Sequence, residues 1–87
     1  MASAPAQLWR ATILVVEDDP KQVRLYTKAL PQHRLLAVDT GTAALKLLKQ
    51  EVPDVIILDH QLAEGEKGAE FLPVLKTDMA HVPVILV

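Results

Sequence analysis

Residues 12–20 read TILVVEDDP, an aliphatic run that breaks off into three consecutive acids. A second stretch, VIILDHQL at residues 55–62, begins with an aliphatic run that gives way to Asp59 in the same manner. Carboxylates are costly to bury and unfavourable in strands, so acids that directly follow core strands need a physical reason. A shared site at the strand ends supplies one, because a divalent cation offsets the mutual repulsion of the carboxylates.

The apolar pattern around these runs predicts alternating strands and helices. Strands are expected at residues 12–16, 35–38, 54–58 and 82–87. Helices are expected at residues 20–30, 40–50 and 69–76. The strands are continuously aliphatic instead of alternating, which is typical of a parallel sheet covered on both faces. The sequence therefore predicts an α/β fold with a three-layer parallel sheet, without internal repeats or a second domain.

Capping residues and prolines indicate where the helices are expected to begin and end. Asp19 suits the N-cap of the first helix, Pro20 its first position and Gln22 the reciprocal place of a capping box, while Pro31 ends it. Pro73 lies inside the third helical pattern, so that helix is either kinked or begins late.

Composition limits the class of protein. The 87 residues carry a formal net charge of −2, so the chain has no basic field for direct nucleic-acid or membrane binding. It has no cysteine, no signal-peptide pattern and no apolar run long enough to span a bilayer, and a cytoplasmic location is expected. Residues 1–10 are interpreted as a flexible leader, with Trp9 packing against a domain at 11–87.

The acids that follow the strands are expected to meet at one sheet edge. Neighbouring parallel strands lie about 4.8 Å apart, so Asp18 and Asp59 can share one ion although they are distant in sequence. Open α/β sheets bind ligands at this carboxyl edge. Carboxylates together with a loop carbonyl form an all-oxygen site, which suits Mg²⁺.

ILVVEDDP, PDVIILDHQL and VPVILV occur in an order and spacing that resemble the receiver domain of bacterial two-component response regulators. The resemblance implies a flavodoxin-like sheet of order 2-1-3-4. It also implies that Asp59 accepts a phosphoryl group from a histidine kinase or a histidine phosphotransfer protein. By position, Asp18 would bind Mg²⁺ directly with Asp59, Glu17 would act through water, and the Gln61 backbone carbonyl would complete the coordination. Asp19 is interpreted as a helix cap instead of a ligand.

The chain departs from the family pattern in the segment after Asp59. Ala63 stands where the family usually has proline, and Gly68 falls nine residues after Asp59 instead of eight, which implies a one-residue insertion. Glu64 and Glu66 are expected to add negative charge near the site.

The chain also ends early relative to that pattern. Val87 precedes the expected Ser or Thr, the later lysine and the last helix-strand-helix of a full receiver, so residues 11–87 are interpreted as a partial receiver domain. An uncovered strand at 82–87 would favour self-association or poor stability, or the chain is the ordered part of something longer.

The leading hypothesis is phosphorelay signalling by a regulatory domain that is not an enzyme. One alternative is a receiver-like protein-interaction module without phosphotransfer. Another is a metal-dependent phosphatase, but that chemistry typically wants an acid where Gln61 stands. His60 is not expected to bind metal, and His33 and His81 are interpreted as solvated loop residues.

Overall fold

The computed structural model describes residues 10–87, which form alternating strands and helices. The strands are β1 (Thr12–Val16), β2 (Arg34–Val38), β3 (Val55–Leu58) and β4 (Val84–Leu86). The helices are α2 (Pro20–Ala29), α3 (Gly41–Leu48) and α4 (Leu72–Asp78), with 3-10 turns η1 (Ala63–Gly65) and η2 (Gly68–Phe71). The leader and the packing expected for Trp9 lie outside the described residues, except for Arg10, which is exposed.

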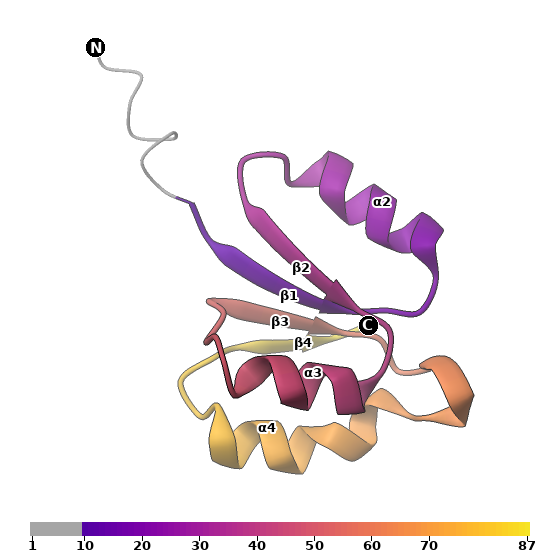
Figure 1. Cartoon of the computed structure of the whole chain (residues 1–87), viewed down its shortest axis with the longest axis vertical. Coiled ribbons are helices and arrows are strands. Elements are labelled where there is room, and N and C mark those ends of the chain that lie inside the picture. Colours follow the sequence, from indigo (N-terminus) through magenta and orange to yellow (C-terminus); the bar gives the residue numbers. More distant parts are fainter. Residues whose placement is uncertain (1–9) are drawn as a thin grey trace.

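The four strands form one parallel sheet in the order β2-β1-β3-β4. Helix α2 lies on one face of this sheet, and α3 and α4 lie on the other (Figure 1). The predicted α/β architecture and strand order are therefore confirmed. All strands point the same way, so the segments that come after them leave the sheet at a common edge.

Each face of the sheet has its own apolar core. Under α3 and α4 the core contains Leu14, Ile56, Leu58 and Leu75, each at most 3% exposed. Under α2 a smaller cluster is formed by residues of β1 and β3 together with Ala11, and Tyr26 of α2 and its C-cap Leu30 pack against it only partly buried. Because β1 and β3 lie in the centre and contribute to both cores, their aliphatic residues are continuous instead of alternating.

Element boundaries differ from the sequence prediction at several places. β2 begins one residue earlier and β3 one residue later than expected. β4 spans three residues, because only Val84–Leu86 pair with β3 as a regular strand. Helix α4 begins late, at Leu72, so Pro73 stands in its first turn, where a missing N–H costs nothing. Within residues 10–87, no helix has both the length and the apolar character needed to cross a bilayer.

The cap of α2 is also built differently from the expected capping box. The Asp19 carboxylate accepts a hydrogen bond from the Lys21 N–H at 2.9 Å, as an N-cap should. However, the N–H of Asp19 donates to the carboxylate of Glu17 at 3.1 Å, which takes the place expected for Gln22. The start of α2 is thereby connected to an acid of the strand end.

Candidate functional site

The candidate site lies where β1 and β3 end side by side. Their register pairs Val16 with Leu58, so Glu17 and Asp59 leave the sheet at the same level. The N–H of Asp59 donates to the Val16 carbonyl at 3.0 Å, and the N–H of Glu17 donates to the Val38 carbonyl at 2.9 Å. Both acids are therefore fixed by backbone bonds that continue the sheet beyond the regular strands.

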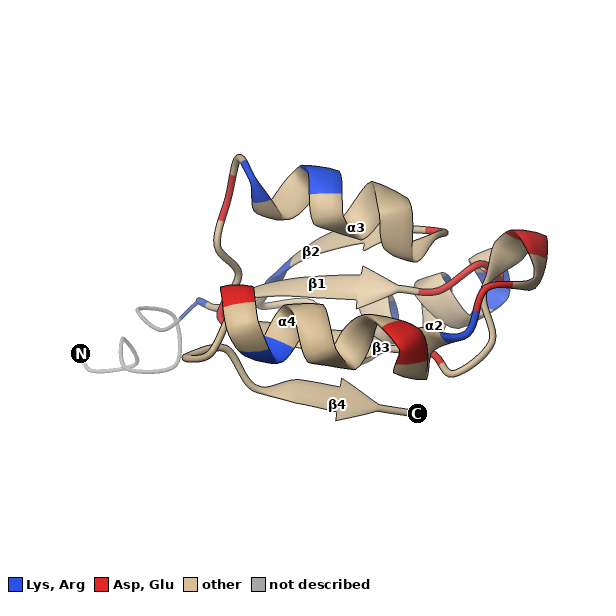
Figure 2. Ribbon diagram, turned by 90° about the horizontal axis from the view of Figure 1, so that it is seen from below, with Lys and Arg blue, Asp and Glu red and all other residues tan. Residues whose placement is uncertain are grey.

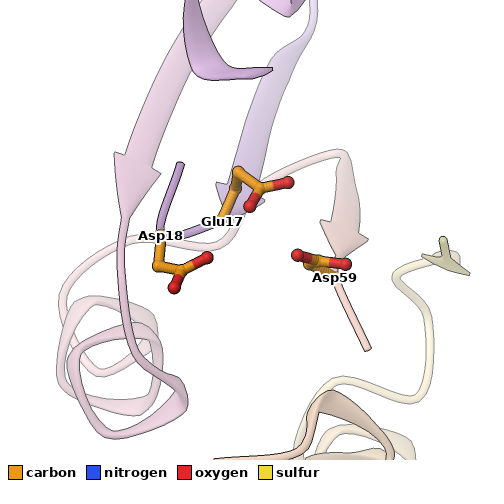
Figure 3. Close-up of side chains that lie close together, drawn as sticks. All are labelled: Glu17, Asp18 and Asp59. Atoms are coloured by element: carbon orange, nitrogen blue, oxygen red, sulfur yellow. The ribbon is translucent and has the colours of Figure 1, made fainter. Parts of the chain in front are cut away.

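Three carboxylates meet at this edge. Glu17, Asp18 and Asp59 each offer an oxygen, and these oxygens lie within 4.8 Å of one another. Figure 3 shows the Glu17 and Asp18 side chains facing the same space as Asp59. Acidic segments gather at this end of the sheet more widely, around the tip of β1 (Figure 2). The structure thus brings together three residues that the sequence analysis predicted as metal ligands.

The three acids differ in their contact with solvent. Glu17 is only 8% exposed, the Asp59 side chain is 19% exposed, and Asp18 is exposed. Burial raises the pKa of Glu17 above its ordinary value, and the neighbouring Asp59 and Asp18 carboxylates raise it further. The hydrogen bond from the Asp19 N–H opposes this effect. Ionisation of Glu17 is therefore less favourable than that of a glutamate in water.

Asp19 and Gln61 border the same open hollow as the three acids. Asp19 is committed to the cap of α2, and it is not part of the three-carboxylate group, in agreement with its interpretation as a cap. Gln61 faces Lys67 in an isolated antiparallel bridge. The bonds of this bridge come from the flanking residues, His60 with Gly68 and Leu62 with Glu66. The bridge therefore does not use the Gln61 carbonyl.

The histidines divide into three environments. The Nδ1 of His60 lies 3.4 Å from a carboxylate oxygen of Asp59 and 2.9 Å from the Val87 carbonyl oxygen, yet His60 is not in the metal-competent group. His81 is exposed, as expected. His33 lies in a loop, as expected, but it is half-buried, and its Nδ1 accepts a hydrogen bond from the Ala11 N–H at 3.0 Å just before β1.

The segment after Asp59 contains a turn with unusual backbone angles. Glu64 has a φ of 62°, and Gly65 comes next with a φ of 78°. Left-handed backbone at two consecutive positions folds the segment back, so that Gly68 reaches Asp59 again. A Cβ on Gly68 would lie 2.0 Å from the Asp59 carbonyl oxygen, so only glycine fits there.

The acids of this turn do not join the three-carboxylate group. The carboxylate of Glu66 accepts hydrogen bonds from the Gly41 N–H at 2.8 Å and from the Thr42 hydroxyl at 3.2 Å. Glu66 is thus directed to the start of α3 and does not belong to the three-carboxylate group. Glu64 is exposed and borders a separate hollow beside α3. Sequence reasoning missed the contact between Glu66 and α3, because no local motif signals it.

The donor set fits a small hard cation. All side-chain ligand atoms that the group offers to a metal are carboxylate oxygens, supplied by Glu17, Asp18 and Asp59. Mg²⁺ prefers oxygen ligands and keeps several waters, which agrees with an open, partly exposed site. The raised pKa of Glu17 is consistent with such a site, because a bound cation would offset the repulsion among the three carboxylates.

Comparison with known proteins gives consistent matches over most of the chain. The family model of the response regulator receiver domain matches residues 13–87. Histidine kinase P4 of Formosa agariphila is 38% identical over 81 residues, which cover 88% of this chain and 6% of that protein. Response regulator protein FleR of Pseudomonas aeruginosa is 35% identical over 78 residues, 87% of this chain and 16% of its own length. The chain therefore spans a small part of these relatives.

A solved structure supports the same relationship. The N-terminal domain of a response regulator receiver protein from Methanoculleus marisnigri superposes with a TM-score of 0.76 at 34% identity. The match covers 87% of this chain and 64% of that one.

Proposed function

Since this chain belongs to the response regulator receiver domain family, the kind of domain that takes part in phosphorelay signalling, we propose that Asp59 is its phospho-acceptor. The observation that carries this proposal is the convergence of Glu17, Asp18 and Asp59 at the ends of two neighbouring strands. Asp59 is the member that directly follows β3 and keeps limited access to solvent, with a side chain 19% exposed. A nucleophile needs such access, because the donor group must approach it from outside.

In the proposed reaction a carboxylate oxygen of Asp59 attacks the phosphorus of a phosphohistidine. A new P–O bond forms while the P–N bond breaks, and the imidazole leaves with the bonding electron pair. The backbone bond from the Asp59 N–H to Val16 holds the residue at the strand end during this exchange. A fixed nucleophile lowers the entropic part of the barrier.

We propose that Mg²⁺ is held by Asp18 and Asp59 directly, by Glu17 through water, and by the backbone carbonyl of Gln61. When bound there, Mg²⁺ would supply positive charge to balance the charge that develops on the phosphoryl oxygens. Glu17 contributes a buried negative charge beside the nucleophile, and its bond from the Asp19 N–H keeps its carboxylate in place.

Receiver domains interact with histidine kinases or phosphotransfer proteins, and we propose such a protein as the phosphoryl donor here. The domain would act as a regulatory phospho-acceptor instead of a classical enzyme. The cytoplasmic location stays a prediction. Self-association through the last strand is a further proposal, supported by three exposed apolar side chains, Ile85, Leu86 and Val87, at 44 to 50% exposure.

Beryllofluoride binding tests the proposed acceptor. It mimics a phosphoryl group on a carboxylate, so the wild-type chain should bind it with Mg²⁺ and lose binding when EDTA is added. Asp59→Asn should abolish binding, because the substituted amide is a poor ligand for beryllium. Asp19→Asn is the matched control: it removes an acid from the same hollow but preserves the helix cap, so binding should remain.

The result also separates this function from the interaction-module alternative, which family membership does not favour. A wild-type chain that is folded by circular dichroism but binds no beryllofluoride at millimolar Mg²⁺ would contradict phosphotransfer.

A further inference from the structure

The turn that comes after Asp59 is tied to a helix far from it in sequence. The half-buried Glu66 places its carboxylate on α3, where it accepts hydrogen bonds from the Gly41 N–H and the Thr42 hydroxyl. The two bonds span 25 and 24 residues of sequence. A carboxylate at a helix start is stabilised by the unpaired N–H groups and by the helix dipole. This contact is therefore a charge-assisted tie between two separate segments.

The backbone of Glu66 also closes the turn. Its carbonyl accepts from the Leu62 N–H at 2.9 Å, and its N–H donates to the Ala63 carbonyl at 3.3 Å. The main chain of Glu66 thus closes the turn at residues 62–66, and its side chain connects this turn to α3.

Gln61 lies between two anchored neighbours. On one side His60 accepts from the Gly68 N–H at 3.0 Å, and on the other side Leu62 is bonded to Glu66. The carbonyl of Gln61 is not used by this bridge, and the residue borders the acidic hollow. The position of that carbonyl depends on where the turn is held.

A second contact keeps α3 close to the same segment. The ring of Phe71 lies against Gly41, where an added Cβ would come within 2.2 Å of it. Glu66 and Phe71 therefore meet the same residue of α3 from the segment after Asp59. The tie is a fixed feature of the packing between the turn and α3.

Resting on the function proposed for Asp59, we propose that Glu66 is a positioning residue for the metal site: its bonds to Gly41 and Thr42 hold the turn that keeps Gln61 at the hollow bordered by the three acids. Without them, Phe71 would still pack against Gly41, but residues 62–66 would have no side-chain hydrogen bond to α3 and would pass through the left-handed pair Glu64 and Gly65. A wider range of carbonyl positions lowers the affinity for Mg²⁺, because fewer molecules present a complete site.

The test compares Mg²⁺ affinity in four variants of the full chain by NMR titration of the Asp18 and Asp59 amide signals. Glu66→Ala removes both bonds and should raise the dissociation constant about three- to tenfold, at or below the usual effect of second-layer changes. Glu66→Gln keeps an acceptor for the Gly41 N–H and should have a smaller effect. Glu64→Ala is the matched control, because it removes an equal charge from the same turn at an exposed position.

Thr42→Val removes only the hydrogen bond that the Thr42 hydroxyl donates to Glu66, and it should also weaken Mg²⁺ binding. This variant replaces Glu66→Ala in the test if Glu66→Ala folds poorly. The amide of Gly41 reports the tie directly, and its protection from hydrogen exchange should fall in Glu66→Ala. A purely structural role would lower the melting temperature without changing the Mg²⁺ affinity of the folded protein.

The possible results separate the two proposals. A wild-type chain that binds no Mg²⁺ overturns the proposed function and this inference with it. Wild-type binding together with equal affinity in Glu66→Ala, despite a loss of Gly41 protection, overturns only the positioning role. Equal losses in Glu64→Ala and Glu66→Ala also overturn it, since charge alone would then explain the effect. The positioning role of Glu66 is supported if the affinity for Mg²⁺ falls from wild type to Glu66→Gln and again to Glu66→Ala.

Discussion

Glu17 and Asp59 come directly after paired residues of two neighbouring parallel strands, and their carboxylates lie within 4.8 Å of each other. Each is fixed by its own backbone N–H, which donates to the strand beside it. The backbones of the two acids are therefore held side by side. Because the sheet holds like charges together, the stability of the protein should depend on pH and on bound cations.

The stability of the metal-free protein should fall as the pH rises through the titration of Glu17. Burial and the neighbouring acids raise its folded-state pKa above the ordinary 4.5. Between the pKa of Glu17 in the unfolded state and its higher pKa in the folded state, the folded protein binds more protons than the unfolded chain. The free energy of unfolding therefore decreases as the pH rises through this interval. Urea unfolding from pH 4 to 8 should show Glu17→Gln gaining stability relative to wild type across this range. A constant difference between the two would contradict the raised pKa.

Mg²⁺ should restore the stability that is lost when Glu17 ionises. Above its dissociation constant, each tenfold increase in free Mg²⁺ should raise the free energy of unfolding by about 1.4 kcal/mol, because it binds only the folded state. The increase should disappear with EDTA and in Asp18→Asn. NaCl at matched ionic strength is the control, and an equal stabilisation by NaCl would indicate screening instead of a site.

Gly68→Ala should be more damaging than Gly65→Ala. A Cβ at Gly68 would lie 2.0 Å from the Asp59 carbonyl oxygen, so the backbone must shift, at about 2 to 3 kcal/mol. Gly65 has open space around it, and its cost of about 1 kcal/mol comes from its φ of 78° alone. Urea unfolding measures both, and the Asp59 amide shift should move only in Gly68→Ala. The reverse ranking of the two variants would be inconsistent with this close approach.

Glu64→Asn should stabilise the protein by about 0.5 to 1 kcal/mol, since asparagine tolerates the left-handed backbone that Glu64 adopts at a φ of 62°. Glu64→Ala keeps the unfavourable conformation and should give no comparable gain. Thermal unfolding of the two variants at the same pH checks the difference. A gain of the same size in both would point to charge instead of backbone conformation.

Much of this fold was predictable because the signals are local. Aliphatic continuity identified β1 and β3, and Thr40 and Pro20 marked helix starts that the structure confirms. The ends of β4 and α4 were less predictable. The run 82–87 is apolar throughout, yet only Val84–Leu86 pair as a strand, because pairing depends on the neighbour β3 instead of the composition.

The sequence by itself determined which chemistry is available: acids placed directly after core strands, and a parallel sheet that gathers them at one edge. The tertiary structure decided how these acids are held. Strand register brought Glu17 and Asp59 to one level, the Asp19 N–H bonded Glu17, and Glu66 turned to α3. Chain order specifies which residue type stands at the end of each strand, whereas contacts between residues such as Gly41 and Glu66 exist only after distant segments have packed.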